Sequence, residues 1–356
     1  MIGSISIWMP HEEQFRDIQK LENLTSIVIL GEVEFHYDAL LKNKQLVIDI
    51  CDFADTRGIP VYFITGLSNL DSNLLLPDDP LLNRFNIIYW PTYWFSYTFN
   101  YLNAEKNVQY NISNGFDIQN MLPYKEYSHT FLSLNNQPHT HRCMLMDMFE
   151  KYNLFENNKV SFRKHTDYNF KYWKFQILTV DQYTNSNTQP LNREQLPSCY
   201  NDCFMQIVAE SEYDNKYTLS GSTCLPLLLG KPFLSLGRQN YMSFLEKFGF
   251  KRYDEIFNYE FDTIKDVSER TESLAVEVNR IQNSKKDWKQ MYERIYPKLV
   301  YNRNLAIELA LDVKNFPNIW LKIAEQNFIP NICVAVYPRI LLKNLNNLYD
   351  KFKVTI

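Results

Sequence analysis

The chain has 356 residues, 45% of them hydrophobic, and a formal net charge of −4 from 37 basic and 41 acidic side chains. This length is typical of two domains, and the apolar content is sufficient for a core in each. The sequence has no basic tail and no Lys/Arg cluster, which disfavours a dedicated duplex-DNA binder but leaves nucleic acid open as an acceptor. It has no apolar run of about 18 residues, so we expect no membrane span.

The beginning of the chain has the pattern of a βαβ unit. An apolar run at 26–30 predicts a buried strand, and helical spacing of apolar residues over 37–56 predicts a helix that Gly58 ends. The next apolar run, 60–66, predicts a second strand. We therefore expect a Rossmann-like domain to begin here, after a lead-in with one polar helix at 12–23.

The turn between this first strand and its helix contains three candidate catalytic side chains, Glu32, Glu34 and His36. It has no Gly-x-Gly-x-x-Gly motif, so we do not expect a dinucleotide there. Ligands of open α/β sheets bind at the carboxyl ends of the strands, where a carboxylate or an imidazole can act as the general base on an acceptor hydroxyl. The alternative is that the acids stabilise the start of the following helix through its dipole.

An aromatic segment follows the third expected strand, 86–90. Residues 91–99, PTYWFSYTF, offer rings that could stack on a sugar or a base. Packing at the edge of the sheet is the more frequent use of such residues. Residues 100–128 are polar and irregular, which predicts a loop or an insertion.

The pattern over 131–162 predicts a second unit, with a strand, a helix of about ten residues and another strand. Arg142 lies at the start of this helix, where a guanidinium can hold a phosphate through two hydrogen bonds. The alternative is a surface arginine on the first turn. His139 and His141 have the spacing of a metal pair, but no further ligand stands at a suitable spacing, so we expect no metal site.

The stretch 204–237 has the length and pattern of a further strand–helix–strand unit. Its apolar strand ends on Glu210, and Ser220 or Ser222 is a natural N-cap of the helix that follows. Free N–H groups and the dipole at a helix start favour an anion, so this turn is a candidate phosphate site to which Thr223 adds a hydroxyl. The alternative is a crossover helix that only packs.

Later in the chain, helices dominate the expected structure. Gly230 and Gly249 are the expected ends of the helix in this unit and of the next one, 240–248. Helical spacing then predicts two long helices, 265–286 and 287–300, and more helices follow toward the end of the chain.

Several of these segments resemble a family of GT-B-like glycosyltransferases of viruses and bacteria that is distantly similar to the α-1,3-fucosyltransferases. The family pattern is a strand that ends in Glu, a Thr-Glu-Lys helix start, a Gly-x-Pro step into a strand, Gly-Phe, and an acidic segment before Tyr-Asp. The corresponding residues are Glu210, Ser220-Gly221-Ser222, Gly230-Lys231-Pro232-Phe233, Gly249-Phe250, Asp254-Glu255 and Phe261-Asp262. The run KLVYNR, from Lys298, matches the family's Lys-Leu-x-His-Asn-Arg except at Tyr301.

The resemblance covers about residues 130–303. It implies an α/β fold with two Rossmann-like domains, a cleft between them, and C-terminal helices that cross back toward the first domain. The domains would be 1–128 on the acceptor side, 129–300 for the nucleotide sugar, and 301–356 for the crossing helices. The implied reaction transfers a sugar from a nucleotide sugar to a hydroxyl of a glycan or a modified nucleobase, without a metal or another cofactor.

The resemblance also implies roles for individual residues. The family's arginine at the start of the first donor-domain helix contacts the diphosphate, and this role falls on Arg142. Glu210 would meet the ribose or the sugar. Gly221 and Ser222 replace the family's Glu and Lys, so the start of the helix at Ser222 and Thr223 would offer N–H and hydroxyl donors instead. This departure leaves the donor sugar and its nucleotide open.

Two other functions stay open. A relative that lost catalysis with its Glu-Lys pair would keep the fold and bind a glycan or a partner. A glycosyltransferase acting on modified bases of viral DNA would fit a composition rich in Asn, Lys, Tyr, Phe and Ile, which is typical of an AT-rich genome. Six cysteines without zinc-site spacing and a start without signal-peptide features predict reduced thiols and a cytoplasmic location, in the host cytoplasm if the chain is viral.

Overall fold

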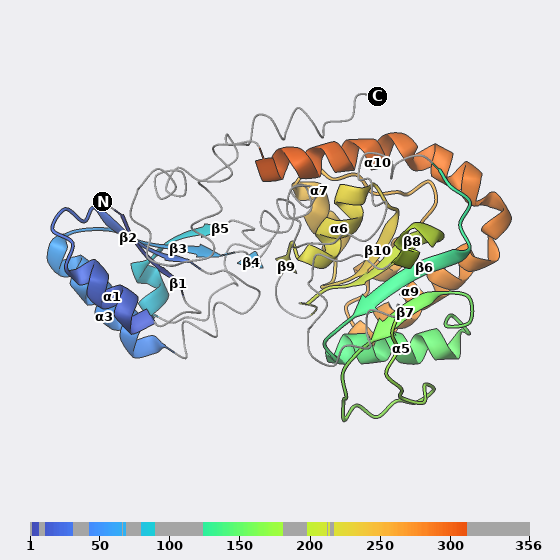
Figure 1. Ribbon diagram of the computed structural model, residues 1–356, viewed down its shortest axis with the longest axis horizontal. Helices are drawn as coiled ribbons and strands as arrows, with labels where there is room; N and C mark the ends of the chain where they lie inside the picture. Colours follow the sequence, from blue (N-terminus) through green and yellow to red (C-terminus); the bar gives the residue numbers. More distant parts are fainter. Residues whose placement is uncertain are drawn as a thin grey trace. The chain divides into compact units, whose positions relative to one another are not determined.

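The computed structural model describes residues 2–6, 11–30, 43–65, 67–68, 80–89, 124–180, 198–211, 213 and 217–311. It confirms an α/β fold in which helices connect the strands of parallel sheets (Figure 1). The chain divides into two compact units, Met1–Phe99 with Leu309–Lys351 and Asn100–Glu308 with Phe352–Ile356. Within the described ranges, no helix combines the length and the apolar character needed to cross a membrane.

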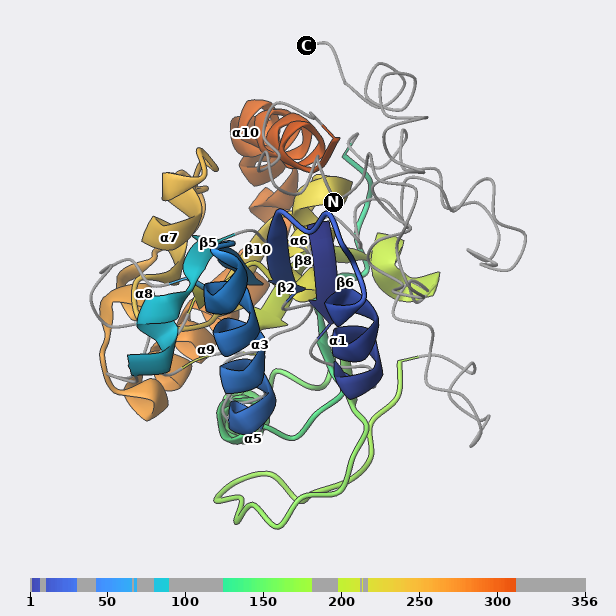
Figure 2. The same cartoon turned by 90° about the vertical axis from the view of Figure 1, so that its left-hand side faces the viewer.

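The first unit has a four-stranded parallel sheet in the order β1-β2-β3-β5. Its strands are β1 (Ile2–Ser6), β2 (Ser26–Leu30), β3 (Val61–Thr65) and β5 (Asn86–Tyr89), with a two-residue strand, β4 (Leu67–Ser68), and a 3₁₀ turn, Pro80–Arg84, before β5. Its helices, α1 (His11–Gln19) and α3 (Lys44–Arg57), lie side by side (Figure 2). Apolar side chains of these helices form one core with those of β2 and β3, including Phe15, Ile18, Ile27, Ile29, Val47, Ile50 and Phe63.

The sequence pattern predicts only a lead-in before β2, and this prediction is wrong at β1. The strand pairs in parallel with β2, with Ile5 opposite Ile29. Three of its five residues are glycine or serine, which have little intrinsic preference for strands. Pairing with β2, rather than local preference, therefore produces this strand.

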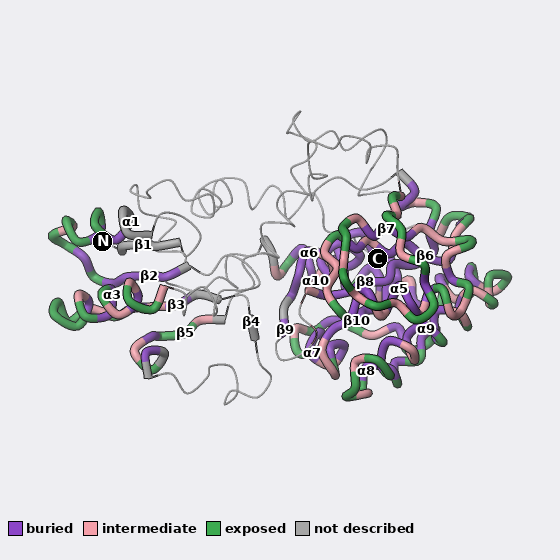
Figure 3. The backbone as a smooth tube through the Cα atoms, turned by 90° about the horizontal axis from the view of Figure 1, so that it is seen from below, coloured by how far each residue is buried: buried purple, intermediate pink, exposed green. Residues whose placement is uncertain are grey.

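The second unit has another four-stranded parallel sheet, in the order β10-β8-β6-β7. Its strands are β6 (His129–Asn135), β7 (Lys159–Phe162), β8 (Cys203–Ala209) and β10 (Phe233–Leu236), and a two-residue strand, β9 (Tyr217–Thr218), precedes β10. Its helices are α5 (Thr140–Lys151), α6 (Gly221–Leu229), α7 (Tyr241–Lys247), α8 (Glu260–Thr263), α9 (Val267–Asn283) and α10 (Trp288–Leu311), with 3₁₀ turns at Ser198–Asp202 and Lys285–Asp287. All seven residues of β8 are buried, and Figure 3 shows that buried residues also predominate in α6 and in the neighbouring strands.

The helix ends follow local sequence signals. Gly230 ends α6 in the left-handed conformation with φ 61°, and Gly58 ends α3 with the same φ. At the start of α6, the Ser220 side chain accepts a hydrogen bond from Ser222 N at 3.0 Å, which confirms Ser220 as the N-cap. Helix α10 differs from the prediction, because it passes through Pro297 and continues beyond residue 300.

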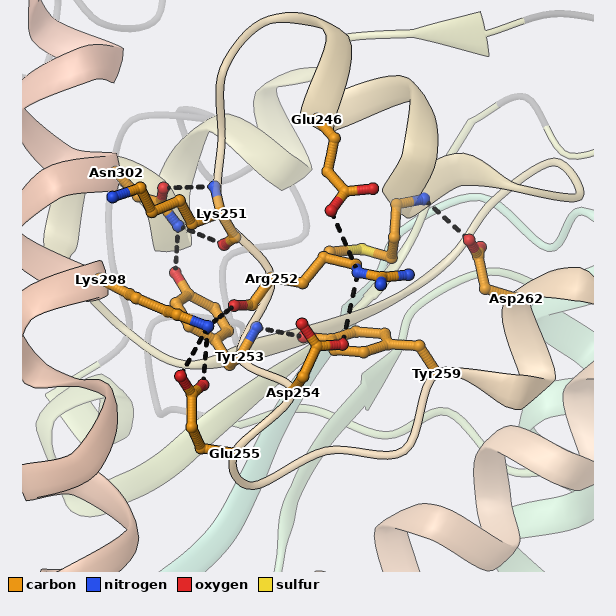
Figure 4. Close-up of polar contacts among 11 residues, drawn as sticks. Glu246, Lys251, Arg252, Tyr253, Asp254, Glu255, Tyr259, Asp262, Lys298 and Asn302 are labelled. Carbon is orange, nitrogen blue, oxygen red and sulfur yellow. Dashed lines mark hydrogen bonds and ion pairs between the residues drawn. The ribbon is translucent and has the colours of Figure 1, made fainter.

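The KLVYNR motif holds the segment after α7 against α10 (Figure 4). Asn302 Oδ1 accepts a hydrogen bond from Lys251 N at 2.8 Å, and Asn302 Nδ2 donates to Lys251 O at 2.8 Å. Lys298 Nζ donates to Arg252 O at 2.8 Å and pairs with Glu255 at 2.7 Å. The side-chain amide of Asn302 thus satisfies both backbone groups of Lys251. Lys298 and Asn302 of the motif therefore have a structural role.

Candidate functional site

The order of the strands reverses in the middle of the second sheet. The chain passes from β6 to β7 on one side, and then places β8 and β10 on the other side of β6. Figures 1 and 2 show that α5, which follows β6, and α6, which follows β8, lie on opposite sides of this sheet. Ligands of open α/β sheets bind at such a reversal, outside the carboxyl ends of the two central strands.

Glu210 is the central side chain at this reversal. It follows the last residue of β8 and is fully buried. Its Oε1 accepts hydrogen bonds from the hydroxyls of Thr223 and Tyr241, the latter at 3.0 Å, and the Tyr241 hydroxyl lies 3.2 Å from Thr223 Oγ1. The carboxylate at the end of β8 is therefore joined to the first turn of α6 and the first residue of α7.

The first turn of α5 reaches the same strand end. Arg142 is 7% exposed, and its Nε and Nη2 donate to Ala209 O at 3.3 and 3.0 Å, while Nη1 donates to Gln137 O at 3.3 Å. His141 Nε2 lies 2.6 Å from Glu210 O and donates to it, because a carbonyl oxygen can only accept. The alternative of a surface arginine is therefore wrong, and contact of Arg142 with a diphosphate stays a prediction.

The imidazole of His141 is neutral in this setting. Burial lowers its pKa well below the usual value, and the positive charge of Arg142 acts in the same direction. With the proton on Nε2, the buried Nδ1 is an acceptor, and it has no hydrogen-bond partner among the described residues. The ring lies against Tyr213, with 4.2 Å between centroids, and against His139, with 5.9 Å.

Two helix starts therefore meet at Glu210. In helix α5, His141 contacts the backbone carbonyl of Glu210, and in helix α6, Thr223 contacts the carboxylate of Glu210. The N-cap of α5, His139, makes no side-chain capping hydrogen bond. Helix starts and a guanidinium favour an anion, and a carboxylate suits hydroxyl groups, so the arrangement combines the groups that a phosphorylated sugar or nucleotide needs.

The structure brings together five of the predicted site residues and leaves three outside the described residues. Arg142, Glu210, Ser220, Ser222 and Thr223 all lie at the reversal between β6 and β8. Glu32, Glu34, His36 and the aromatic run 91–99 lie outside the described residues. Among the described residues, no group of three His, Cys, Asp or Glu side chains could hold a metal ion.

Sequence reasoning missed two members of this cluster. Tyr241 contacts Glu210 from 31 residues away along the chain, and no local pattern predicts that contact. His141 stands out in the sequence only as half of a metal pair, whereas the structure places its Nε2 on the end of β8. A helix start that follows β6 was the one available signal for His141, since such starts lie at the carboxyl edge of a parallel sheet.

Comparison of the chain with protein-family models and with curated proteins found no match. Function is therefore inferred from the fold and from the geometry of the site.

Proposed function

We propose that the chain is a glycosyltransferase that binds a nucleotide sugar at the reversal of its second sheet. It transfers the sugar to a hydroxyl of a glycan or of a modified nucleobase. In this proposal the two units are the acceptor and donor domains of a GT-B-type enzyme with a cleft between them. The observation that supports it most is the meeting of a buried arginine, a buried carboxylate and two helix starts at one reversal point of a parallel sheet.

In this proposal each group has a defined task toward the donor. The diphosphate accepts hydrogen bonds from Arg142 and from the N–H groups at the start of α6, which neutralise the leaving group without a metal or another cofactor. Glu210 already accepts hydrogen bonds from two hydroxyls. The vicinal hydroxyls of a ribose offer the same chemistry and would replace the Thr223 or Tyr241 hydroxyl as donors.

The acceptor hydroxyl needs a general base. We propose that Glu32, Glu34 or His36 removes its proton as the sugar is transferred, since each follows a parallel strand in the sequence. Substitution of these residues one at a time, Glu32→Gln, Glu34→Gln and His36→Asn, identifies the base. The expected result is a large loss of turnover in one variant with little change in donor binding, whereas equal turnover in all three contradicts this assignment.

A second function is favoured by two observations. Gly221 and Ser222 stand where the family that the chain resembles has Glu and Lys. In addition, the side chains of Arg142 and Glu210 already form hydrogen bonds to other protein groups. A protein that kept the fold but lost catalysis would show this arrangement. Such a protein binds a glycan or a partner and does not bind nucleotide sugars.

Thermal-shift measurements with nucleotide sugars and their free diphosphates separate the two functions. A ligand at 100 times its dissociation constant adds about 2.7 kcal/mol to the free energy of unfolding, which raises Tm by a few degrees. The Arg142→Lys variant keeps the charge but loses the two-pronged contact. Arg294→Lys, on an exposed position of α10, is the matched control.

The proposed enzyme predicts a shift with one nucleotide that Arg142→Lys loses and Arg294→Lys keeps. The absence of a shift with any nucleotide or diphosphate contradicts the enzyme and favours the binding protein. A shift that Arg142→Lys leaves unchanged contradicts the diphosphate role of Arg142.

A further inference from the structure

A hollow opens at the other edge of the second sheet, where its strands begin. Its polar lining residues are Lys125, Tyr127, Asn201, Lys231 and Tyr292, and the end of α6 completes it. Asn201 lies two residues before β8 and Lys231 two residues before β10, so the hollow lies at the amino edge, away from Glu210 and Arg142. Two lysines and no carboxylate line the described hollow, which gives it a positive charge.

Lys231 is the most deeply buried cation of this hollow. The residue is 5% exposed, and its Nζ donates to Cys203 O. Its ammonium lies 4.7 Å from the ring centroid of Tyr200 and 5.4 Å from that of Tyr127. No carboxylate of the described residues forms an ion pair with it. A buried ammonium is costly unless a partner of opposite charge and several hydrogen bonds compensate it, and one carbonyl and two ring faces compensate it only in part.

The shifted pKa of Lys231 agrees with a positive charge that the described residues compensate only in part. Burial lowers its pKa to about 8, and the positive charge of Lys125 acts in the same direction. The charge of Asp202 raises it, but Asp202 is exposed and does not line the hollow. The phenols of Tyr127 and Tyr292 are held in their neutral, hydrogen-bond-donating form, because burial raises the pKa of both.

We propose that this hollow binds a small oxyanion, a carboxylate or a phosphate, between the ammonium groups of Lys231 and Lys125. An anion there supplies the negative partner that Lys231 lacks among the described residues. The hydroxyls of Tyr127 and Tyr292 hydrogen-bond to each other, which leaves one phenol proton, and the amide of Asn201, as further donors. The site is separate from the proposed donor site, since α6 begins at the one and ends at the other. It therefore does not depend on the proposed function.

The test is a thermal-shift titration of the full chain with sodium phosphate and with sodium acetate, at constant ionic strength set by sodium chloride. The expected result is a saturable rise in Tm of a few degrees with phosphate or acetate, which no equal amount of chloride produces. If only phosphate raises Tm, the site is specific for phosphate. If acetate raises Tm as well, the site binds carboxylates and other small oxyanions. A wild-type protein that responds to neither, or equally to chloride, overturns the proposal.

Three variants locate the effect. Lys231→Met keeps the length of the side chain and removes the charge, so the anion should no longer raise the Tm of this variant. Lys125→Gln should lower the affinity for the anion several-fold. Arg142→Lys should keep the rise, which distinguishes this site from the proposed donor site. A rise that persists in Lys231→Met overturns the proposal, and if that variant does not fold, an unchanged anion affinity in Lys125→Gln overturns it.

Discussion

The two parallel sheets of this protein differ in strand order, and the difference locates the candidate site. The first sheet follows chain order through its described strands, β1-β2-β3-β5, whereas the second reverses between β6 and β8. Among the described residues of the first unit, Ser26 is the one buried polar residue, but the second unit buries His141, Arg142, Glu210 and Thr223 at its reversal. Polar side chains are also buried elsewhere in the second unit, so the candidate site is marked by the hydrogen bonds that join these four residues at the end of β8, and not by burial alone.

The largest difference between the two units is expected for their arginines. Arg142→Ala removes two donors from the buried carbonyl of Ala209 and one from the half-buried carbonyl of Gln137, and should lower the free energy of unfolding by about 2–4 kcal/mol. Arg84 in the first unit pairs with Asp52 at 2.8 Å and with Asp55 at the surface, so Arg84→Ala should cost less than about 1 kcal/mol. Urea unfolding measures the free energy of unfolding of both variants. Equal losses in the two would contradict the expectation that the buried arginine stabilises the protein more than the surface arginine does.

Asp262 should make the stability of the second unit depend on pH. Burial raises its pKa from 3.8 to about 6, although the N–H groups of Tyr241 and Met242, both at 3.0 Å, oppose the shift. Because the folded state binds this proton more tightly than the unfolded state, Asp262 stabilises the protein as pH falls from about 7 toward 4. The stability of the wild type relative to Asp262→Asn should rise by roughly 2–3 kcal/mol over that range.

The difference from Asp262→Asn is the quantity to measure, because His141 acts with the opposite sign. Its pKa is lowered by burial, so its contribution to stability is lost as pH falls below the unfolded value of 6.5. Chemical denaturation of both proteins at several pH values cancels the His141 contribution. A pH profile that is identical in wild type and variant contradicts the assignment to Asp262.

Thr223 tests the internal partners of the carboxylate at the reversal. Thr223→Val keeps the shape of the side chain and removes the hydroxyl that donates to Glu210, which should destabilise the protein by about 1–3 kcal/mol. Ser222→Ala, at the neighbouring half-buried position, is the matched control and should change stability by less than about 0.5 kcal/mol. A Thr223→Val variant as stable as the control means that the hydrogen bond to Glu210 contributes little.

The smallest effect is expected where the two units are alike. Gly58 and Gly230 both end a connecting helix with φ 61°, a conformation that costs a residue with a Cβ about 1 kcal/mol or more. A Cβ at Gly58 meets no atom within 4 Å, so Gly58→Ala should cost only this strain. Gly230→Ala, at a buried position, should cost at least as much, and thermal unfolding of the two variants makes the comparison.

Much of the fold could be predicted from local patterns. Apolar runs predicted β2, β3, β5, β6, β7, β8 and β10, and the cap residues Ser220, Gly58 and Gly230 lie where the sequence signals place them. The strand β1 could not be predicted, because its glycine and serines carry no strand preference and its pairing partner is distant in the sequence. The extension of α10 beyond residue 300 likewise depends on packing rather than on caps.

The sequence by itself determined which residues stand at the ends of strands and at the starts of helices, because hydrophobic periodicity and caps act over short distances. Together with the family resemblance, which implies the diphosphate role of Arg142, this was sufficient to propose Arg142, Glu210, Ser220, Ser222 and Thr223 as donor-site residues. Only the tertiary structure decided that the strand order reverses between β6 and β8, that Tyr241 reaches Glu210, and that Lys231 is buried beside Tyr127. These features depend on which strands pair and how helices pack on them, and contacts between distant residues leave no periodic signal in the chain.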